Sequence, residues 1–531
     1  MANSLLSNGN VDTRSLTPSQ TPTATVVAGI SGVRQNAAVA ICVDGELAAF
    51  CEQERVTRVR RAGIAAGLLP LEALDTALAS AGDLPRSAVR RFVAAEPGLD
   101  LPVSVPTLHM DHHHAHAATA HYLSPFDRSA VFICDHHSRA ATTAWLGGPD
   151  GVTQMEWPVG GQGFASLYSE CAAVFGYPPG SEHLLEALAR LDGSGEALQL
   201  DDVIGYRDGA LTISPEWKSR TARWLSEGAR DVLRHRASVA GAFQRHMGGL
   251  LLQTLADVKK QSGMPTLALG GGLFYNTWLT TLVRQSRLFD DVFVAPNPGN
   301  AGVAAGAALS VANGRAKKPG SVSPFLGPEY GPEEIKRTLD NCKLAYEVLD
   351  ERRLIESTAA ALVRGELVGW FQGRMEWGHR ALGNRSILAS PLSPYVLDNL
   401  NVYLKHRDRH RTYGVSVPVE RVNEFFSGPP VSRYMEYEFE PLDRPRFAYL
   451  LPEGAHSLRV QTIPAEPDPG SSPLFRSLHE HFGRTTGVPV LVNTSFNGFR
   501  EPMVCSPRDA VRVFFGSGLD RLVLGRFVVR K

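Results

Sequence analysis

The sequence has no excess of charge of either sign and no long hydrophobic run. Its 54 lysines and arginines balance 54 aspartates and glutamates, which gives a formal net charge of zero. A dedicated nucleic-acid binder normally carries a basic excess, so this balance argues against nucleic acid as a partner. The apolar runs fall short of the roughly eighteen residues that a membrane span needs, so no membrane association is expected.

Cysteine is scarce: the 531 residues include six, widely scattered, and no CxxC pair occurs among them. This excludes the usual zinc-ribbon and redox motifs. Isolated cysteines are typical of buried thiols in a reducing compartment, and we see no signal peptide, so we predict a cytoplasmic protein. Hydrophobic residues make up 43% of the chain, which is ample for the two or three domains that its length suggests.

Composition along the chain predicts four segments. Residues 1–24 are rich in Ser, Thr, Asn and Pro and are expected to be a disordered tail. Residues 25–312 are expected to form a first domain. Residues 313–331 are rich in Gly, Pro, Ser and Lys without periodicity, which is typical of a linker. Residues 332–531 are then a second domain.

Two stretches of the first domain begin in the same way, with three strands and then helices. The turn Asp44-Gly45 between apolar runs is a hairpin signal. This repetition predicts the duplicated actin/hexokinase-like α/β architecture, with two unrelated hairpins as the alternative. The expected elements are strands at Val26–Ile30, Ala37–Val43, Glu46–Glu54, Ala130–Cys134, Ala141–Leu146 and Val152–Trp157, a helix at Ala65–Ala81, and mostly helical structure over residues 180–262.

The most distinctive stretch is FQGRMEWGHRALGNRSILASP, residues 371–391, which follows the apolar strand Leu367–Trp370. It combines Arg374, Arg380 and Arg385 with three glycines. Glycines let backbone N–H groups approach an anion closely, and arginine forks match phosphate or carboxylate oxygens two at a time. We interpret this stretch as an anion site, and a solvated basic loop is the alternative.

Histidines are concentrated in MDHHHAHAATAHY, residues 110–122. His112 and His116 are four residues apart, which on a helix places both imidazoles on one face. Asp135 follows a buried strand, where its carboxylate can complete a metal site. Imidazole and oxygen donors without a thiolate suit iron, manganese or zinc, whereas a solvated, pH-sensitive histidine patch is the alternative.

Two strands of the first domain run into turns that are followed by helices. Gly270-Gly271-Gly272 ends the strand Thr266–Gly272 and precedes a helix that is expected from Phe274. The strand Val292–Ala295 leads through a turn that contains Asn300 into a second helix. Backbone N–H groups at such turns often hold nucleotide phosphates, although tight helix–strand packing also explains the glycines.

Polar residues also end two elements of the second domain. A helix capped by Ser393 is expected to lead into the basic run KHRDRHR, residues 405–411, which is otherwise a solvated helix end. The buried strand Val488–Asn493 ends in NTSFN, which contains Ser495 and Asn497. Small hydroxyl and amide groups suit a flat polar ligand, with ordinary turn chemistry as the alternative.

The segment GRMEWGHRALGNRS, residues 373–386, resembles the GRMEWGPRALGNRS signature of the NodU/CmcH family of O-carbamoyltransferases, which modify antibiotics and nodulation factors. The resemblance recurs downstream and covers nearly all of the chain after Ala24. It implies an actin/hexokinase-like (ASKHA) first domain and a YrdC-like second domain. The histidine segment resembles the family's iron-binding one, and also the metal subunit that makes threonylcarbamoyladenosine in tRNA.

The resemblance assigns roles residue by residue. KHRDRHR matches the family's KxRxxxRPF segment, with Thr412-Tyr413 in place of Pro-Phe, and residues 457–462 match its ARxQ strand. The implied carbamoyl-adenylate residues are Arg374, Arg380, Arg385, Lys405, Arg411, Arg459, Ser495 and Asn497. The implied nucleotide residues of the first domain are Gly270, Gly271, Gly272 and Asn300, and the implied metal ligands are His112, His116 and Asp135.

The resemblance therefore implies an ATP-dependent carbamoyltransferase of natural-product biosynthesis. ATP and carbamoyl phosphate would react in the second domain with Mg²⁺, giving carbamoyl adenylate and pyrophosphate. The first domain would pass the carbamoyl group to a small-molecule hydroxyl or amine beside Fe²⁺, Mn²⁺ or Zn²⁺. Carbamoyl phosphate and the acceptor are the expected partners, and a homodimer stays open.

The first domain departs from the family pattern at four places. Gln35-Asn36 replace its His-Asp, Asn300-Ala301 replace the two aspartates of its GDDG, HLLEALA at residues 183–189 replaces its KxMGLA, and His136-His137 follow Asp135 instead of Gly-x. His136 and His137, with His114, are candidates for a replacement base or ligand. Three hypotheses stay open: a working carbamoyltransferase with a rebuilt acceptor site, an enzyme that uses carbamoyl adenylate differently, and a non-catalytic or regulatory relative.

Overall fold

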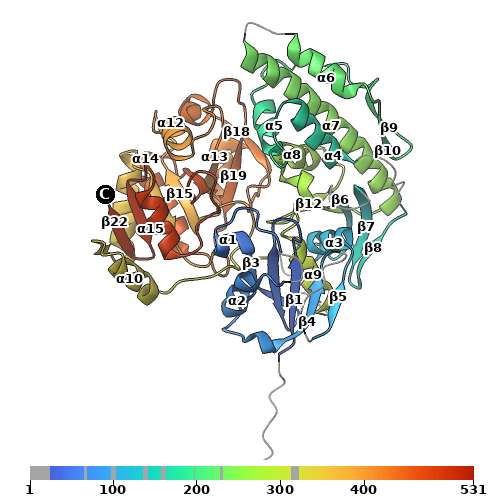
Figure 1. Cartoon of the computed structure of the whole chain (residues 1–531). Helices are drawn as coiled ribbons and strands as arrows, with labels where there is room; N and C mark the ends of the chain where they lie inside the picture. The colour runs from blue at the N-terminus through green and yellow to red at the C-terminus, as the bar shows by residue number, and fades with distance from the viewer. Residues whose placement is uncertain are drawn as a thin grey trace, which may run out of the picture.

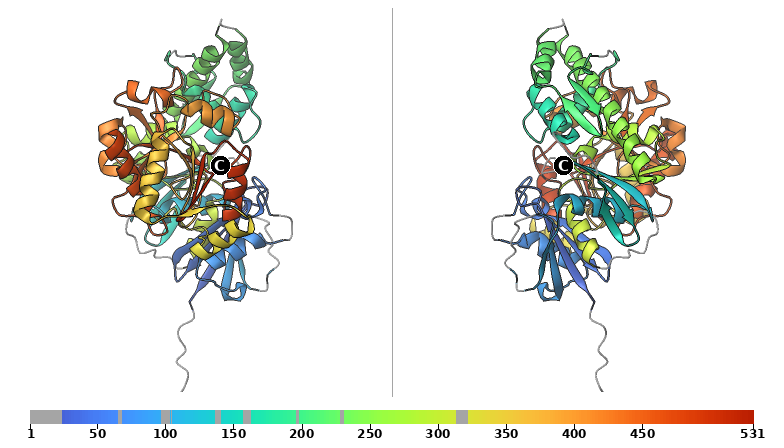
Figure 2. Two further views of the ribbon diagram at one scale, coloured as in Figure 1. Left: turned by 90° about the vertical axis from the view of Figure 1, so that its left-hand side faces the viewer. Right: turned by 90° about the vertical axis from the view of Figure 1, so that its right-hand side faces the viewer.

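The computed structural model describes residues 24–64, 68–96, 103, 105–135, 141–156, 163–195, 198–227, 231–312 and 322–531. They form two halves that lie side by side, the first coloured blue to yellow-green and the second yellow to red (Figure 1). Figure 2 shows from both sides that the blue sheet lies at one end of the first half and the green helices at the other. Residues 1–23, nearly all of the predicted tail, lie outside the described residues.

The first half opens with a five-stranded sheet in the order β3-β2-β1-β4-β5. β1 is antiparallel to β2 and parallel to β4, and β2 is antiparallel to β3. Asp44 and Gly45 have positive φ angles of 50° and 85°, which confirms the predicted hairpin turn. The strands are β1 Val26–Ser31, β2 Ala38–Val43, β3 Glu46–Glu52, β4 Val89–Ala94 and β5 Thr107–His109.

A second five-stranded sheet repeats this arrangement in the order β12-β11-β6-β7-β8. β6 is antiparallel to β7 and parallel to β11, and β7 is antiparallel to β8. The repeat confirms the predicted duplication of the strand order. The strands are β6 Ser129–Cys134, β7 Thr142–Gly148, β8 Gly151–Gln154, β11 Thr266–Gly270 and β12 Asp291–Val294.

Two helices pack together between these sheets, α3 His112–Tyr122 against β6 and β11, and α9 Val303–Val311 against β1 and β4. A Cβ on Gly306 of α9 would meet the carbonyl oxygen of Ala115 at 2.2 Å, so glycine permits this close approach. None of the described helices is long and apolar enough to cross a membrane. The remaining helices of this half are α1 Gln53–Thr57, α2 Leu71–Ser80, α4 Phe164–Val174, α5 Glu182–Ala189, α6 Trp217–Ser226, α7 Val232–Ser262 and α8 Thr277–Gln285.

Three details of the first half differ from the sequence-based expectations. Residues 180–262 are not helical throughout, because β9 Ile204–Arg207 and β10 Ala210–Ile213 form a hairpin there. The helix predicted from Phe274 begins later: a 3₁₀ turn spans Gly272–Tyr275, and the Asn276 side chain then caps α8 by accepting the N–H of Leu279. The helix predicted at Ala65–Ala81 is α2, and residues 65–67 lie outside the described part.

The second half is built on a ten-stranded sheet in the order β13-β22-β21-β14-β15-β20-β16-β19-β18-β17. Its strands are β13 Glu347–Val348, β14 Val368–Phe371, β15 Arg385–Ala389, β16 Gly414–Pro418, β17 Phe426–Ser427, β18 Glu438–Pro441, β19 Leu458–Ile463, β20 Leu491–Ser495, β21 Arg521–Leu524 and β22 Phe527–Arg530. Its helices are α10 Pro332–Asn341, α11 Glu351–Val363, α12 Val396–Asp398, α13 Val422–Phe425, α14 Pro473–Thr486 and α15 Pro507–Phe515. The predicted cap Ser393 lies in a turn before α12, where its carbonyl group accepts the N–H of Val396 at 3.2 Å.

The described part of the predicted linker, residues 322–331, is packed rather than free. The carbonyl group of Leu326 accepts the N–H of Phe50 in β3 at 3.1 Å. The carbonyl groups of Pro324 and Pro328 accept backbone N–H groups of the loop 371–391, each at 2.9 Å. This segment therefore lies between the two halves and bonds to both, while residues 313–321 lie outside the described residues.

Candidate functional site

Two histidines and one aspartate meet where α3 begins and β6 ends. Asp111 caps α3 by accepting the N–H of His114 at 3.0 Å, and His112 opens the helix. His116 follows one turn later, and Asp135 directly follows β6. The ligand atoms of His112, His116 and Asp135 all lie within 4.8 Å of one another, and all three side chains are buried. The structure thus brings together the three residues that the sequence predicts as metal ligands.

The electrostatics of this cluster suit a cation. Burial and the neighbouring His112 lower the pKa of His116 to about 3, so its imidazole is neutral. Its Nε2 atom is buried and has no hydrogen-bond partner among the described residues. Burial lowers the pKa of His112, but its Nε2 contact of 3.2 Å with Asp135 Oδ2 raises it above the ordinary value overall. An orphaned imidazole nitrogen beside a second imidazole and a carboxylate fits a divalent metal ion.

A third imidazole, His113, borders the cluster and was not singled out by sequence reasoning. Its Nδ1 lies 2.8 Å from Thr143 Oγ1, and its Nε2 is buried without a partner in the described part of the chain. Its position next to His112 was the signal available. The predicted catalytic residues His136 and His137 lie outside the described residues.

The predicted glycine turn packs against the same cluster. Gly270 ends β11, and Gly271 follows with a φ angle of 101°. A Cβ on Gly271 would meet the carbonyl oxygen of Cys134 at 2.2 Å, so only glycine fits. The N–H of Gly272 donates to Asp135 Oδ1 at 3.4 Å. The turn that could hold a phosphate is therefore tied directly to a predicted metal ligand.

The second turn places Asn300 at the cluster as well. The Asn300 side chain forms a hydrogen bond with His116. This contact raises the pKa of His116 slightly, whereas burial lowers it. Next to it, a Cβ on Gly302 would meet the carbonyl oxygen of Asn297 at 1.9 Å, which fixes a tight turn before α9. The position predicted to contact a nucleotide thus lies beside an imidazole, and its amide brings no negative charge there.

Two arginines of the loop 371–391 donate hydrogen bonds to backbone carbonyl groups. Arg385 is 0% exposed, and its Cζ lies 3.6 Å from the Phe371 ring centroid. It donates to the carbonyl groups of Gln372, Gly373, Asn384 and Pro328. Arg374 donates to the carbonyl groups of Leu326, Gly327 and Ala48 at 2.7, 3.1 and 3.1 Å. Both side chains thus stabilise the backbone around this loop, and their predicted ligand contacts stay predictions.

Glu376 shapes the tip of this loop and leaves Arg380 open to a ligand. The Glu376 Oε1 atom accepts backbone N–H groups at 2.8, 2.8 and 3.0 Å from Leu382, Asn384 and Arg385. Arg380 has a buried Nε without a partner among the described residues. Its Nη2 reaches only the carbonyl oxygen of Tyr275, in the first half, at 3.5 Å.

The basic run 405–411 lies beside the end of β20. A π-helical turn, Asn399–Leu404, precedes Lys405. Lys405 Nζ donates to the carbonyl oxygens of Ser495 and Asn497 at 2.7 and 3.0 Å, and Ser495 Oγ donates to Asn497 Oδ1 at 3.0 Å. Burial and then Arg407 hold the pKa of Lys405 well below its usual range. The structure thus brings these three predicted site residues together.

Arginines that no carboxylate contacts directly in the described chain lie nearby, and Glu186 and Glu438 offset their charge only from a distance. Burial, followed by Arg380 and Arg190, holds the pKa of Arg459 well below its usual range, and its Nε has no partner in the described chain. Burial, followed by Arg407 and Arg190, lowers the pKa of Arg411 to about 10. Across the described residues no carboxylate forms an ion pair with Arg380, Arg411 or Arg459. Enclosed cations without counterions favour binding of an anion.

A buried ionic network joins the halves next to these arginines. Arg190 follows α5 in the first half, donates to Glu186 at 2.9 Å, and also pairs with Glu438 on β18 of the second half. Thr277 Oγ1 donates to both carboxylates at 2.9 Å. Burial raises the pKa of Glu438, but Arg190 lowers it to about 2 overall. Sequence reasoning missed the network because Arg190 and Glu438 are 248 residues apart.

His379 and Tyr275 lie between the arginines and the metal cluster. Their ring centroids are 4.2 Å apart, and the Tyr275 hydroxyl donates to Asn297 Oδ1 at 2.5 Å. Burial and then Glu52 raise the pKa of Tyr275, and Asp135 adds to this effect. The His379 side chain is exposed, yet the surrounding protein and then Arg380 hold its pKa well below its usual range. His379, from the second half, is therefore surrounded by groups of both halves.

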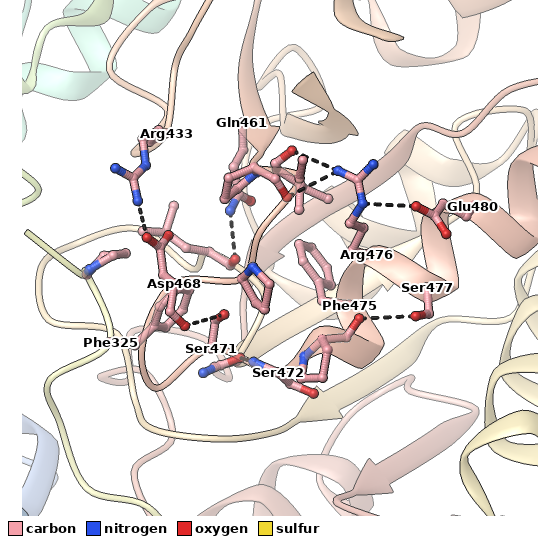
Figure 3. A pocket seen from close by; sticks show the side chains of 18 residues that line it. Phe325, Arg433, Gln461, Asp468, Ser471, Ser472, Phe475, Arg476, Ser477 and Glu480 are labelled. Atoms are coloured by element: carbon pink, nitrogen blue, oxygen red, sulfur yellow. Dashed lines mark hydrogen bonds and ion pairs between the residues drawn. The ribbon is translucent and has the colours of Figure 1, made fainter. Parts of the chain in front are cut away.

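A separate pocket of about 280 Å³ lies behind the loop 371–391 (Figure 3). Its charged groups pair with one another: Arg433 with Asp468, and Arg476 with Glu480 at 2.9 Å. Gln461, which lines the pocket, donates to the carbonyl group of Leu382 at 2.7 Å. Because these groups already have partners, we assign no ligand to this pocket.

Two family models match the chain, the carbamoyltransferase N-terminus over residues 99–309 and the carbamoyltransferase C-terminus over residues 359–531. Together they include the histidine cluster, the glycine turn and all of the basic residues described above.

Curated relatives span most of the chain. The nodulation protein NolO of Bradyrhizobium diazoefficiens is 31% identical over 438 residues, which covers 80% of this chain and 79% of that protein. An uncharacterized protein of Synechocystis is 30% identical and covers 81% of this chain and 77% of that protein. The 3'-hydroxymethylcephem-O-carbamoyltransferase of Amycolatopsis lactamdurans is 32% identical over 52% of this chain and 51% of that protein. The chain therefore belongs to the NodU/CmcH-type carbamoyltransferase family and is an enzyme of the carbamoyltransferase type.

Proposed function

We propose that this enzyme makes carbamoyl adenylate in its second half from ATP and carbamoyl phosphate, and transfers the carbamoyl group to a small-molecule acceptor in its first half. One observation carries the proposal. Lys405, Ser495 and Asn497 are joined by hydrogen bonds, and Arg380, Arg411 and Arg459, none of which forms an ion pair among the described residues, are coupled to this group and to one another electrostatically through Arg407 and Arg190. Preorganised cations of this kind stabilise the charge that develops during phosphoryl and adenylyl transfer.

The proposed reaction balances in two steps. Carbamoyl adenylate keeps one phosphorus atom, so water first releases inorganic phosphate from carbamoyl phosphate and leaves carbamate. A carbamate oxygen then attacks the α-phosphorus of ATP, the bond to the β-phosphate breaks, and pyrophosphate leaves with the electron pair. Such chemistry needs charge neutralisation and positioning more than a nucleophilic side chain, which suits arginines with Mg²⁺ as the expected ion. Ser495 and Asn497 would bond the flat carbamoyl group.

The first half would receive the activated carbamoyl group. His112, His116 and Asp135 would hold a divalent ion, for which Fe²⁺ is our first choice and Mn²⁺ or Zn²⁺ the alternatives. A bound ion of this kind lowers the pKa of a nearby hydroxyl or water. The contact between His379 and Tyr275 lies between the two sites, and the turn 270–272 would offer backbone N–H groups to a second nucleotide.

We also propose that the acceptor's nucleophile needs little help from a base, which favours an amine over a sugar hydroxyl. Asn300 contacts His116 where the family has an aspartate, so the cluster carries less negative charge. Gln35 stands where the family has a histidine, the residue best suited to take a proton near neutral pH. Mass spectrometry of the products formed from amine and alcohol acceptors, with ATP and carbamoyl phosphate, decides between the two classes.

The adenylation step is tested by pyrophosphate release from ATP and carbamoyl phosphate in the presence of Mg²⁺. Arg411→Ala removes a charge-assisted contact, so we expect it to lose about 2–4 kcal/mol of transition-state stabilisation. Arg409→Ala is the matched control, because Arg409 lies in the same basic run but is exposed and pairs with Asp398 at 3.1 Å. If the purified wild-type enzyme releases no pyrophosphate with any divalent ion, the assignment of the second half is wrong.

A further inference from the structure

A loop of the first half, residues 58–61, is fixed against the second half. Arg58 donates to the carbonyl oxygens of Met503 and Pro502 at 2.6 and 2.7 Å. Arg61 donates from Nη2 to the carbonyl oxygen of Gly180 at 2.5 Å, just before α5. The backbone at Arg58 and Arg61 has positive φ angles of 63° and 57°. Anchors on both sides hold this tight loop in place, and the residue between them, Arg60, stays exposed.

The contact of Arg61 with Gly180 places the loop 58–61 three residues before His183, and arginines of both halves, Arg60 among them, act electrostatically on this histidine. His183, Glu186 and Arg190 are spaced i, i+3 and i+7, so they share one face of α5 and its end. Arg190 donates to Thr412 Oγ1 at 3.5 Å, which directs this face toward Arg411. Although the His183 side chain is exposed, the surrounding protein and then Arg411, Arg60, Arg61 and Arg407 lower its pKa to about 3.

The carboxylates nearby are engaged elsewhere. Glu54 pairs with Arg55 at 3.1 Å, and Glu182 accepts the Ser169 hydroxyl at 2.9 Å. Glu186 is bound to Arg190. Asp408, whose charge raises the pKa of Arg407, is exposed and forms no ion pair with it in the described part of the chain. Arg60 and Arg411 likewise have no ion-pair partner in the described chain, so the group carries a local positive charge without a counterion.

Two of these arginines are held in place by uncharged groups. Arg407 donates from Nε to Asn401 Oδ1 at 2.8 Å, and its Cζ lies 4.2 Å from the Tyr413 ring centroid. Arg61 is held by Gly180. Guanidinium groups that converge from two sides suit an anion with several charges and several oxygens, such as a polyphosphate, better than a single carboxylate.

We propose that Arg60, presented by the first half, completes the polyphosphate site of the second half and binds the pyrophosphate that leaves during adenylation. The identity of this anion rests on the proposed function; the anion site itself rests on the loop and the arginines. When the bond between the α- and β-phosphates breaks, negative charge passes to the leaving pyrophosphate, and Arg60 with Arg411 neutralises it. The second half alone would lack this contact, so adenylation needs both halves in place.

The test measures binding of inorganic pyrophosphate with Mg²⁺ to the full-length enzyme by isothermal titration calorimetry. We expect Arg60→Ala to weaken binding at least about tenfold and Arg60→Lys to weaken it less, because lysine keeps the charge but loses the fork. Arg91→Ala is the matched control, since Arg91 is an exposed arginine of the first half, on β4, and we expect no change. Raising the salt concentration should reduce the difference in pyrophosphate affinity between wild type and Arg60→Ala, because salt screens the charge of Arg60.

Two readouts separate this inference from the proposed function. If wild type releases no pyrophosphate from ATP but Arg60→Ala still weakens pyrophosphate binding, the adenylation proposal fails and the anion site stands. If wild type releases pyrophosphate while Arg60→Ala binds it as tightly as Arg91→Ala does and keeps the wild-type KM for ATP, the role of Arg60 is overturned. Equal thermal midpoints for the variants show that folding is intact, as expected for an exposed side chain.

Discussion

At the residue scale, the proposed metal site of the first half depends on the imidazole of His116. His116→Ala removes one of three protein ligands, so we expect anaerobically purified enzyme to lose its iron, manganese or zinc. His114→Ala is the control, because His114 lies on the same helix but packs against Trp145 with ring centroids 5.3 Å apart. Elemental analysis gives the metal content of both variants. A wild type without stoichiometric metal, or a His116→Ala variant that keeps it, contradicts the proposed site.

The arginines show how far residue types alone can predict a site. The sequence predicts Arg374, Arg380 and Arg385 as parts of one anion site, but in the described structure Arg374 and Arg385 each bond to several backbone carbonyl groups, whereas Arg380 reaches a single one, at 3.5 Å. Arg385 is fully buried on backbone carbonyl groups that strand pairing does not satisfy, and no local pattern distinguishes such an arginine from a ligand-binding one. The histidine cluster was predictable because helix periodicity and a strand end fix its geometry locally.

At the element scale, most of the fold could be predicted from the residues that form turns. The duplicated order of the two five-stranded sheets follows from hairpins such as Asp44-Gly45, and it was predicted. Helix starts were less accurate, because α8 follows a 3₁₀ turn and α12 follows the turn that begins at Ser393, and periodicity marks neither turn. The segment 322–331 reads as a linker by composition, but its backbone hydrogen bonds to partners far away in the sequence hold it in place.

The packing of α14 on β16 gives the enzyme a pH-dependent element. His479 donates from Nδ1 to the carbonyl oxygen of Phe475 and accepts the Ser416 hydroxyl at Nε2, both at 2.8 Å, and burial lowers its pKa to about 4. The unfolded chain, with a pKa near 6.5, binds more protons between these values, so this stability is present above pH 6.5 and is lost as the pH falls toward 4.

We therefore expect His479→Gln to lose less stability than wild type on going from pH 7 to pH 5. The free energy of unfolding should fall more steeply with decreasing pH in wild type than in His479→Gln. The two slopes should differ by at most about 1.4 kcal/mol per pH unit, the value for one proton. Urea denaturation of both proteins at several pH values measures it. His113, His116 and His183 also resist protonation, but they are common to both proteins and cancel in the comparison. Parallel pH curves for the two proteins would show that His479 is not the group responsible.

At the scale of the whole molecule, the two halves interlock rather than simply touch. The tip of the loop 371–391 enters the first half, where Arg55 donates to the carbonyl oxygen of Gly378 at 2.8 Å. A Cβ on Gly378 would meet the carbonyl oxygen of Pro296 at 2.7 Å, so glycine permits this contact. Arg55 and Gly378 lie 323 residues apart, and for that reason the sequence could not reveal how the two halves meet.

The network of Arg190, Glu186 and Glu438 tests whether this interlocking matters for activity. Arg190→Met leaves two buried carboxylates without their partner, so we expect a loss of about 3–5 kcal/mol in the free energy of unfolding. Arg220→Ala, which breaks an exposed pair with Asp202, should cost less than about 1 kcal/mol.

Adding Glu186→Gln and Glu438→Gln to Arg190→Met removes the charges that need a partner, so most of the lost stability should return. The network also touches Thr412, the residue after Arg411, and joins α5 to β18. If it positions the halves, the triple variant regains its unfolding midpoint but releases pyrophosphate more slowly than wild type. A triple variant with wild-type stability and wild-type pyrophosphate release would mean that the network contributes to folding alone, and that other contacts, such as those of Arg55 and Arg58, hold the two sites in register.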